Sequence, residues 1–340
     1  MKLLSKLALL GNERLPGKRV FFIYTHKNGY DRFAHGLKAN TEISYFCFSA
    51  LKEAFGRVTF LRLADENPAR IARITNRDVV VGHPGETFMK ASLRTRKLIT
   101  FAPFVGHEDH VTAKGSHCSD KDEEMSVYAH AQCSILLTSE YNKREYLDRE
   151  RNFWAPFFRN RRYRVVHQPI DLTLFKRNKM EYTTSDFLYV GHLGHMKCVP
   201  SSVALVAEVG RTLHLFGTEN KRLNNRDQQQ IAALPKLADF FIQPGMWEAQ
   251  SVAILEAAAR GFIPIVSPET GYPYIHPYLL RYDDHSYNLA TLKRLLTTTA
   301  EERKELGDAL YCSLLHDNNH NAWKKLTDVL VEEVGILLAK

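Results

Sequence analysis

The sequence lacks the features by which several large protein classes are recognised. No apolar run of about 20 residues is present, the length that a membrane-spanning helix needs. There is no G-x-x-x-x-G-K-[ST] loop, no G-x-S-x-G, and no G-x-G-x-x-G opening the first helix. P-loop NTPases, serine hydrolases and typical dinucleotide dehydrogenases are therefore disfavoured. The five cysteines are scattered without a C-x-x-C pair, which indicates reduced thiols and not a disulfide framework or a zinc ribbon.

The composition is that of an ordinary soluble protein large enough for two domains. The chain has 340 residues, of which 44% are hydrophobic and 25% charged. Its net charge of +8 favours anionic partners such as nucleotides, acidic lipids, acidic polymers or nucleic acid, without choosing among them. The apolar run near the start is short and interrupted by Lys6, so it indicates an amphipathic helix and not a signal peptide. We expect a cytoplasmic location.

Ten short apolar runs recur along the chain, rich in β-branched and aromatic residues and bounded by polar turns. They lie at 20–25, 58–63, 78–83, 97–104, 134–139, 163–168, 186–191, 212–217, 239–244 and 262–267. Such runs are typical of strands buried on both faces of a parallel sheet. Helical patterns lie between them, the clearest at 43–56, 199–210 and 251–261, and each of these ends at a glycine.

The alternation of strand and helix patterns predicts an α/β fold with parallel sheets. Ten strands exceed one doubly wound domain, and a polar stretch near 170–185 marks a break. We expect two Rossmann-like domains, over 1–168 and 169–318, whose sheets face each other across a cleft. Ligands bind outside the carboxyl ends of parallel strands, so the substrate is expected in that cleft.

A glycine-containing turn follows the apolar run at 186–191. It extends from Gly191 to Lys197 (GHLGHMK) and leads into the helix expected at 199–210. Glycines let a backbone approach a phosphate, and the free N–H groups of a helix start point toward it. Lys197 would add a point charge suited to a diphosphate. The alternative is an ordinary turn with a surface lysine, because glycine patterns are weak in isolation.

Two glutamates flank the start of the helix expected at 251–261. Glu248 precedes this helix, and Glu256 lies about a turn and a half inside it. A carboxylate accepts hydrogen bonds from paired sugar hydroxyls, while the adjacent helix N-terminus attracts phosphates. The alternative is a capping carboxylate with a surface glutamate. A third segment, PETGYP from Pro268, is a glycine turn at the carboxyl end of a strand, where backbone N–H groups could face a ligand.

Together these segments resemble the GT-B glycosyltransferases of the retaining family 4 type. Glu248 and Glu256 have the spacing of that family's E-x7-E motif. The stretch ADFFIQPGMWEAQSVAILEAAARGFIPIVSPETGYP follows its order of strand, glutamate, helix, strand and glycine turn. VVHQPIDLTLFKR is similar to its interdomain segment, and FLYVGHLGHMKC to its phosphate site. The resemblance is strongest over about 163–275 and only topological over 1–160.

The resemblance implies roles for individual residues. Lys197 corresponds to the cation that neutralises the donor diphosphate, with Gly191 and His192 in the same turn. Glu248 corresponds to the catalytic glutamate that contacts the transferred sugar, and Glu256 to the glutamate that holds the ribose hydroxyls. The resemblance also implies retention of the anomeric configuration.

The remaining implied residues lie in other segments. Ser251, Thr270 and Gly271 are expected at the donor, with the backbone of the Gly271 turn facing it. His83 falls where the family often has a histidine near the acceptor, and is the second catalytic candidate. As in GT-B relatives, a last helix within 319–340 is expected to pack back on the N-terminal domain.

The sequence departs from the family pattern in three places. His192 replaces the usual arginine, and because an ordinary histidine pKa is roughly 6.5, diphosphate binding is expected to weaken at higher pH. Gln250 and Ser251 replace the usual Phe-Gly, which implies a differently shaped sugar pocket. The glycine-rich acceptor loop is only hinted at by Lys27–Tyr30.

Three further segments could suggest other sites. The histidines at 107, 110 and 117 lie in a polar loop, where an acceptor role is favoured over metal binding, and no metal site is predicted. Asp120 and Asp122 form a D-x-D in a solvated acidic run. The segment 149–164 interleaves arginines with aromatics and could hold an acidic membrane surface peripherally, or bury its aromatics in the core.

The predicted function is transfer of a sugar from a UDP- or GDP-linked nucleotide sugar to a hydroxyl of a glycan, lipid-linked or protein acceptor. Lys197 and helix dipoles are expected to stabilise the leaving diphosphate in place of a metal ion, and no further cofactor is expected. Two alternatives remain open. One is a GT-B sugar-nucleotide epimerase, and the other is an inactive glycosyltransferase-like scaffold that binds an anionic polymer. Nucleic acid is not the expected partner.

Overall fold

The computed structural model of the protein describes residues 18–24, 43–63, 66–82, 85–101, 132–137, 139–147, 159, 161–170, 172, 175–191, 197–217, 228–245, 250–317 and 322–340. The chain forms two compact units. The first comprises Met1–Thr138, Lys143–Val166 and Trp323–Lys340, and the second comprises Ser139–Asn142 and His167–Ala322. Both ends of the sequence therefore belong to the first unit.

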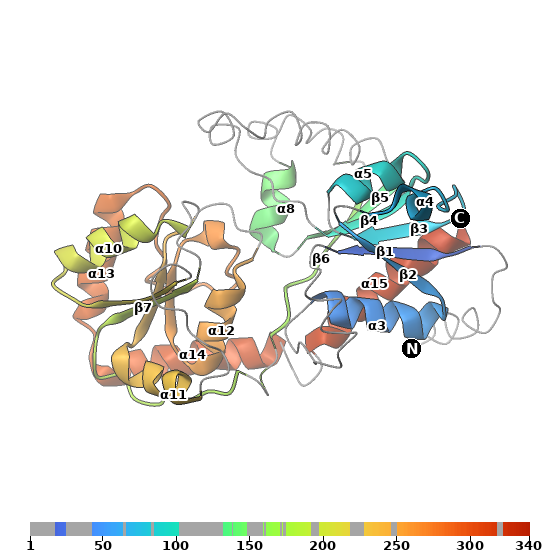
Figure 1. The fold of residues 1–340 in the computed structure, drawn as a ribbon. Helices are drawn as coiled ribbons and strands as arrows, with labels where there is room; N and C mark the ends of the chain where they lie inside the picture. The colour runs from blue at the N-terminus through green and yellow to red at the C-terminus, as the bar shows by residue number, and fades with distance from the viewer. Residues whose placement is uncertain are drawn as a thin grey trace. The chain divides into compact units, whose positions relative to one another are not determined.

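A parallel sheet lies at the centre of the first unit (Figure 1). Its described strands are β1 (Val20–Tyr24), β2 (Val58–Arg62), β3 (Val79–Gly82), β4 (Lys97–Phe101), β5 (Gln132–Leu137) and β6 (Arg162–Val165). Their order is β2-β1-β3-β4-β5-β6, and all neighbouring pairs are parallel. The chain order reverses between β1 and β3, which is the topological switch point of this sheet.

Helices cover both faces of the first sheet. They are α3 (Ile43–Phe55), α4 (Pro68–Ile71), α5 (Glu86–Ser92) and α15 (Ala322–Ala339), while α8 (Glu140–Leu147) begins in the second unit and continues into the first. Alternate strand residues pack against α3 and α15 on one face and against α4 and α5 on the other. Phe21 and Phe22 of β1 illustrate this, since they are buried in different clusters.

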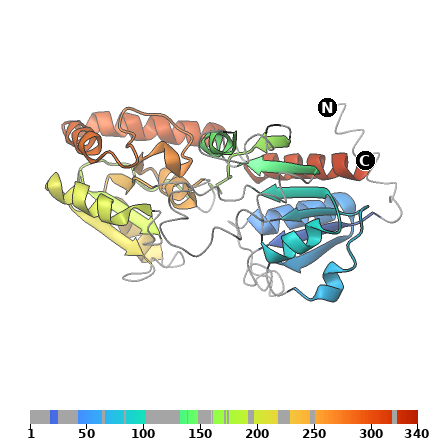
Figure 2. The same cartoon turned by 90° about the horizontal axis from the view of Figure 1, so that it is seen from above.

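The last helix, α15, closes one face of this sheet and runs along it (Figure 2). Leu330 and Val334, one turn apart, are fully buried against the strands. Glu333 is also fully buried, and its carboxylate lies 2.9 Å from the guanidinium of Arg162 and 3.3 Å from that of Arg164 on β6. The helix is thus held to the sheet by apolar burial together with a buried ion-pair cluster.

The second unit contains a parallel sheet of its own. Its described strands are β7 (Phe187–Gly191), β8 (Leu213–Gly217), β9 (Phe240–Gln243) and β10 (Ile263–Val266), in the order β10-β9-β7-β8. Its helices are α10 (Val199–Glu208), α11 (Gln228–Leu237), α12 (Val252–Arg260), α13 (His285–Leu296) and α14 (Ala300–Asp317), with a 3-10 turn, η2 (Pro268–Thr270). Residues of α10 and α13 pack on one face of the sheet, and those of α11 and α12 on the other. The switch point lies between β7 and β9.

A buried charge cluster closes the amino edge of this second sheet. Asp239, directly before β9, is fully buried and lies 2.7 Å from the ammonium of Lys179 and 3.2 Å from the guanidinium of Arg303. Its carboxylate also accepts a hydrogen bond from the backbone N–H of Ser185 at 2.9 Å. Because these charges satisfy one another within the fold, this edge is structural. The carboxyl edge is where a ligand site is expected.

The predicted α/β class, with two Rossmann-like units built on parallel sheets, is confirmed. Each of the ten apolar runs overlaps a strand, although β5 and β6 begin one or two residues before their runs, and the three helical patterns correspond to α3, α10 and α12. Gly261 ends α12 with φ of 95°, and a Cβ there would lie 2.8 Å from the carbonyl oxygen of Lys179. Glycine is therefore required at this stop. The predicted cleft between the two sheets stays a prediction.

Candidate functional site

The carboxyl edge of the second sheet brings several predicted residues together at the switch point. Strand β7 is paired with β8 on one side and β9 on the other, so the segments that leave β7 and β9 diverge from neighbouring positions. In an open parallel sheet this divergence leaves a crevice suited to a ligand. The segment after β7 contains Lys197, and the segment after β9 leads to Ser251 and α12.

The turn after β7 begins at a position that requires glycine. Gly191 has φ of 152°, and a Cβ there would lie 3.2 Å from the hydroxyl of Tyr189. The prediction for His192 lies outside the described residues. At the far end of the turn, Cys198 adopts a left-handed conformation with φ of 49° and precedes the first turn of α10.

Lys197 stands at the N-terminal end of α10. Its side chain is largely buried, and this burial lowers the pKa of its ammonium to about 8. A cation beside the positive end of a helix dipole is also electrostatically unfavourable. Both effects are relieved when an anion binds at this position. The local structure is therefore compatible with a phosphate group, and the predicted role of Lys197 stays a prediction.

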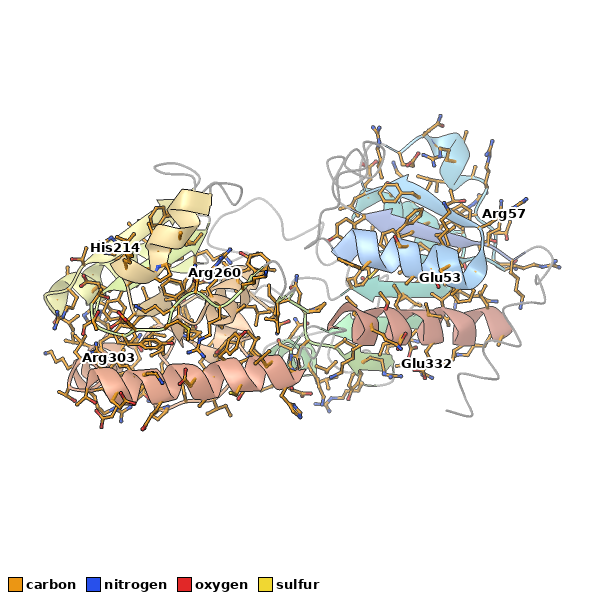
Figure 3. All side chains as sticks on the ribbon, turned by 90° about the horizontal axis from the view of Figure 1, so that it is seen from below. Glu53, Arg57, His214, Arg260, Arg303 and Glu332 are labelled. Atoms are coloured by element: carbon orange, nitrogen blue, oxygen red, sulfur yellow. The ribbon has the colours of Figure 1, made fainter. Side chains whose placement is uncertain are left out.

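Glu256 is the fifth residue of α12, whose N-cap is Ser251. Burial raises the pKa of the Glu256 carboxyl to about 7, and the guanidinium of Arg260, one turn further along α12, opposes this shift. Burial also lowers the pKa of Arg260, which lies over the ring of Phe175 (Figure 3). Glu256 is thus not a solvated surface glutamate. It is a poorly hydrated carboxylate that gains from hydrogen-bond donors.

The turn after β10 is attached to the start of α12. The backbone N–H of Ser251 donates to the carbonyl oxygen of Thr270 at 3.0 Å. The Thr270 hydroxyl donates to the carbonyl of Ser267 at 2.6 Å, and the Ser267 hydroxyl donates to the carbonyl of Gly245. Gly271 follows with φ of 71°. Because the Thr270 hydroxyl is engaged within the protein, Thr270 is suited to hold this turn in place and not to contact a ligand.

Two glutamines at this edge make contacts that the sequence did not indicate. The side-chain oxygen of Gln250 accepts a hydrogen bond from the backbone N–H of Gln168, which fastens the interdomain segment to the start of α12. Gln243 ends β9, and its Oε1 lies 3.4 Å from the Ser251 hydroxyl, while its amide nitrogen is buried without a hydrogen-bond partner in the described residues. The sequence signal was weak: Gln243 is a polar residue at the end of a strand, and Gln250 is a polar residue at the end of a loop. Many strands and loops end in this way, so the pattern does not single out these two residues.

Both predicted catalytic residues, Glu248 and His83, lie outside the described residues. The strand before His83 is described: β3 ends at Gly82, directly beside β1 at the switch point of the first sheet. A Cβ at Gly82 would lie 2.2 Å from the carbonyl oxygen of Ile23, so only glycine fits there. The histidines at 107, 110 and 117 also lie outside the described part of the chain.

The described residues include neither a cluster of metal ligands nor a membrane-spanning helix. Within them, no group of three or more His, Cys, Asp or Glu side chains is placed to hold a metal ion. None of the helices that the structure describes combines the length and apolarity needed to cross a bilayer.

Solved structures of glycosyltransferases share this architecture, although no protein-family model and no curated protein matches the sequence. S. aureus TarM, solved as a variant in complex with fondaparinux, alpha-GlcNAc-glycerol and UDP, has a TM-score of 0.54 at 9% identity, over 78% of this chain and 56% of TarM. This chain thus spans little more than half the length of TarM.

Two further neighbours match over nearly their whole length. An alpha,alpha-trehalose-phosphate synthase (UDP-forming) from Burkholderia vietnamiensis has a TM-score of 0.56 at 9% identity, over 94% of this chain and 99% of that one. WaaG, a glycosyltransferase involved in lipopolysaccharide biosynthesis, has a TM-score of 0.53 at 12% identity, over 92% and 99%. At these identities the likeness concerns the fold. The chain therefore has the GT-B fold, with two Rossmann-like parallel α/β units in one polypeptide.

Proposed function

We propose that this protein transfers a sugar from a UDP- or GDP-linked nucleotide sugar to a hydroxyl of a glycan, lipid-linked or protein acceptor, with retention of configuration. One observation carries the proposal. A partly buried lysine just before α10 and a partly buried glutamate on α12 follow β7 and β9, the two strands beside the switch point of the second sheet. The names of the structural neighbours support the same reaction class.

The diphosphate is assigned to Lys197 and the first turn of α10. When the glycosidic bond to the donor breaks, negative charge grows on the leaving diphosphate. A fixed cation and the backbone N–H groups of a helix N-terminus stabilise that charge without rearrangement, although Pro200, the second residue of α10, provides no N–H. Anion binding also raises the lowered pKa of Lys197, so the lysine becomes more fully charged when the donor is present. In this proposal Lys197 and the helix dipole supply the positive charge that a metal ion supplies in other transferases.

The nucleoside is assigned to Glu256. In its ionised form the carboxylate accepts two hydrogen bonds from a pair of ribose hydroxyls, which replaces the hydration that burial has removed. The E-x7-E resemblance assigns Glu248 to the transferred sugar and His83 to the acceptor hydroxyl. The backbone of the turn at Gly271, held by the Ser251–Thr270 hydrogen bond, completes the donor side.

The proposal is tested by the thermal stability of the protein with UDP, GDP, ADP and CMP and with their sugars. A nucleotide present at about 100 times its Kd raises the free energy of unfolding by about 2.7 kcal/mol, which a thermal shift resolves. Lys197→Ala and Glu256→Ala should abolish the shift. The matched controls Lys293→Ala and Glu305→Ala, at exposed positions on α13 and α14, should keep it.

Two results would contradict the proposal. If no nucleotide stabilises the wild type, the donor site is not a nucleotide site. If the control variants lose the response together with the site variants, the response is not located at this edge. A nucleotide sugar that is consumed without any acceptor, yielding an epimer, would favour the epimerase alternative.

A further inference from the structure

The amino edge of the first sheet contains a row of mostly basic residues. It lies at the opposite end of the strands from the carboxyl edge, where a ligand is expected. The register places Val20 opposite Val58 and Val79, and Val80 opposite Leu98. The residues just before these strands therefore form one row, with neighbours about 5 Å apart. The row has four members, three of them arginines. In the order of the strands β2, β1, β3 and β4, they are Arg57, Arg19, Asp78 and Arg96.

Only one arginine of this row is neutralised. Arg19 lies 2.9 Å from Asp78, whose carboxylate is fully buried. Arg57 and Arg96 are exposed and make no ion pair with any described residue, and the same holds for Arg77. Figure 3 labels Arg57 just after α3, the helix that contains the exposed Glu53.

Two more exposed arginines extend the row. The guanidinium of Arg94 donates to the carbonyl of Ala72 at 2.7 Å, and that of Arg19 donates to the carbonyl of Arg73. These bonds bring the loop before β4 and the loop before β3 to the same edge. Burial lowers the pKa of Lys97, with a further lowering by the neighbouring Lys18 that Asp78 opposes. We define the amino-edge patch as Arg57, Arg73, Arg77, Arg94 and Arg96.

An apolar side chain stands beside these cations. Leu93, adjacent to Arg94, has 83% of its surface exposed, although it directly follows a helix that buries Phe88 and Ala91. A leucine so exposed gains nothing from a phosphate chain or from bulk water. It gains free energy at the boundary between lipid headgroups and acyl chains, where cationic neighbours meet lipid phosphates.

We propose that the amino-edge patch, with Leu93, binds the surface of a membrane that contains acidic phospholipids. Five arginines on one edge match the number of basic residues that holds a peripheral segment on an anionic leaflet. The segment 149–164 is a weaker candidate in its described part, because Arg162 and Arg164 are paired with Glu333. The inference is independent of the proposed sugar transfer.

The test uses the full chain and flotation with two kinds of vesicle. One kind is phosphatidylcholine alone, and the other adds about 30% phosphatidylglycerol. The patch variant Arg57→Ser/Arg77→Ser/Arg96→Ser removes arginines whose side chains bond to no described residue, so it should fold normally, which circular dichroism checks. The control variant Arg211→Ser/Lys236→Ser/Lys293→Ser removes the same charge from exposed positions of the second unit.

The wild type and the control variant should float with the acidic vesicles at low salt, and neither should float with phosphatidylcholine alone. Each arginine at an anionic surface contributes about a five-fold gain, so the patch variant should partition on the order of a hundred-fold less. Leu93→Ser should weaken flotation several-fold while leaving any binding to single-stranded DNA unchanged.

Three results would overturn the inference. The wild type could fail to float with acidic vesicles at low salt. The patch and control variants could lose binding equally, which would indicate net charge alone. Finally, Leu93→Ser could leave flotation unchanged while single-stranded DNA binds through the patch, which would assign this edge to a nucleic acid.

Discussion

Glu256 is predicted to destabilise the free protein at the pH where it functions. Burial raises the pKa of its carboxyl from 4.5 to about 7, so the folded state binds a proton more tightly than the unfolded state does. Between these two pH values the free energy of unfolding therefore falls as pH rises. The shift of about 2.5 pH units corresponds to a loss of about 3 kcal/mol above pH 7, as an upper bound.

The substitution Glu256→Gln removes this titration while keeping the shape of the side chain. At about pH 4 the variant and the wild type should be equally stable, because the wild-type carboxyl is then neutral. At about pH 8 the variant should be more stable by up to about 3 kcal/mol, or about 6–12 °C in the melting temperature of a unit of this size. The variant should nevertheless lose the stabilisation by nucleotide, since an amide is a weaker acceptor for ribose hydroxyls.

The assay is thermal unfolding of wild type and variant between about pH 4 and pH 8, with and without nucleotide. Glu305→Gln on α14 is the control, because that carboxylate is exposed and its substitution should change stability by less than about 0.5 kcal/mol at any pH. If Glu256→Gln is no more stable than the wild type at pH 8, Glu256 is hydrated or fully compensated by Arg260. The reasoning from burial would then be refuted.

Three further predictions follow from the same geometry. The affinity of the wild type for a nucleotide diphosphate should rise as Glu256 ionises near pH 7, and it should fall above about pH 8 as Lys197 loses its proton. Lys197→Arg should remove the fall, because arginine stays charged. A titration of Kd against pH measures both effects. Gly191→Ala should lower the free energy of unfolding by about 1–3 kcal/mol in thermal or urea unfolding, because a φ of 152° strains a residue with a Cβ and the hydroxyl of Tyr189 would have to move aside. An unchanged stability would mean that this turn relaxes freely. Glu333→Ala should cost about 1.5–3 kcal/mol, measured on the unfolding transition of the first unit, because it removes the buried carboxylate that the partly exposed Arg162 and Arg164 share, while Glu332 still lies near both.

Part of the fold follows from local pattern alone. A run such as VFFIY before a polar turn buries side chains on both faces only as a central parallel strand, and β1 shows this burial. Gly261 predicted the end of α12 because a left-handed residue stops a helix there. These features depend on neighbours within a few residues, so the sequence contains the information needed to predict them.

For the candidate site, the sequence predicted which residues belong to it and their order along the chain, but not the contacts among them. The spacing of Glu248 and Glu256 and the turn before Lys197 indicated a donor site through their family resemblance. The sequence could not indicate that Ser251 and Thr270 are joined by a backbone hydrogen bond, or that Gln250 holds Gln168, because these contacts join segments distant along the chain.

The sequence by itself determined which segments become strands and helices, because hydrophobic period and helix stops are local properties. Tertiary structure alone decided which strands are neighbours, and hence that the turns after β7 and β9 diverge at one switch point. It also decided how deeply Lys197 and Glu256 are buried, and therefore that their pKa values move toward neutrality from opposite sides. The physical reason is that hydration depends on every atom packed around a group, and those atoms come from distant parts of the chain.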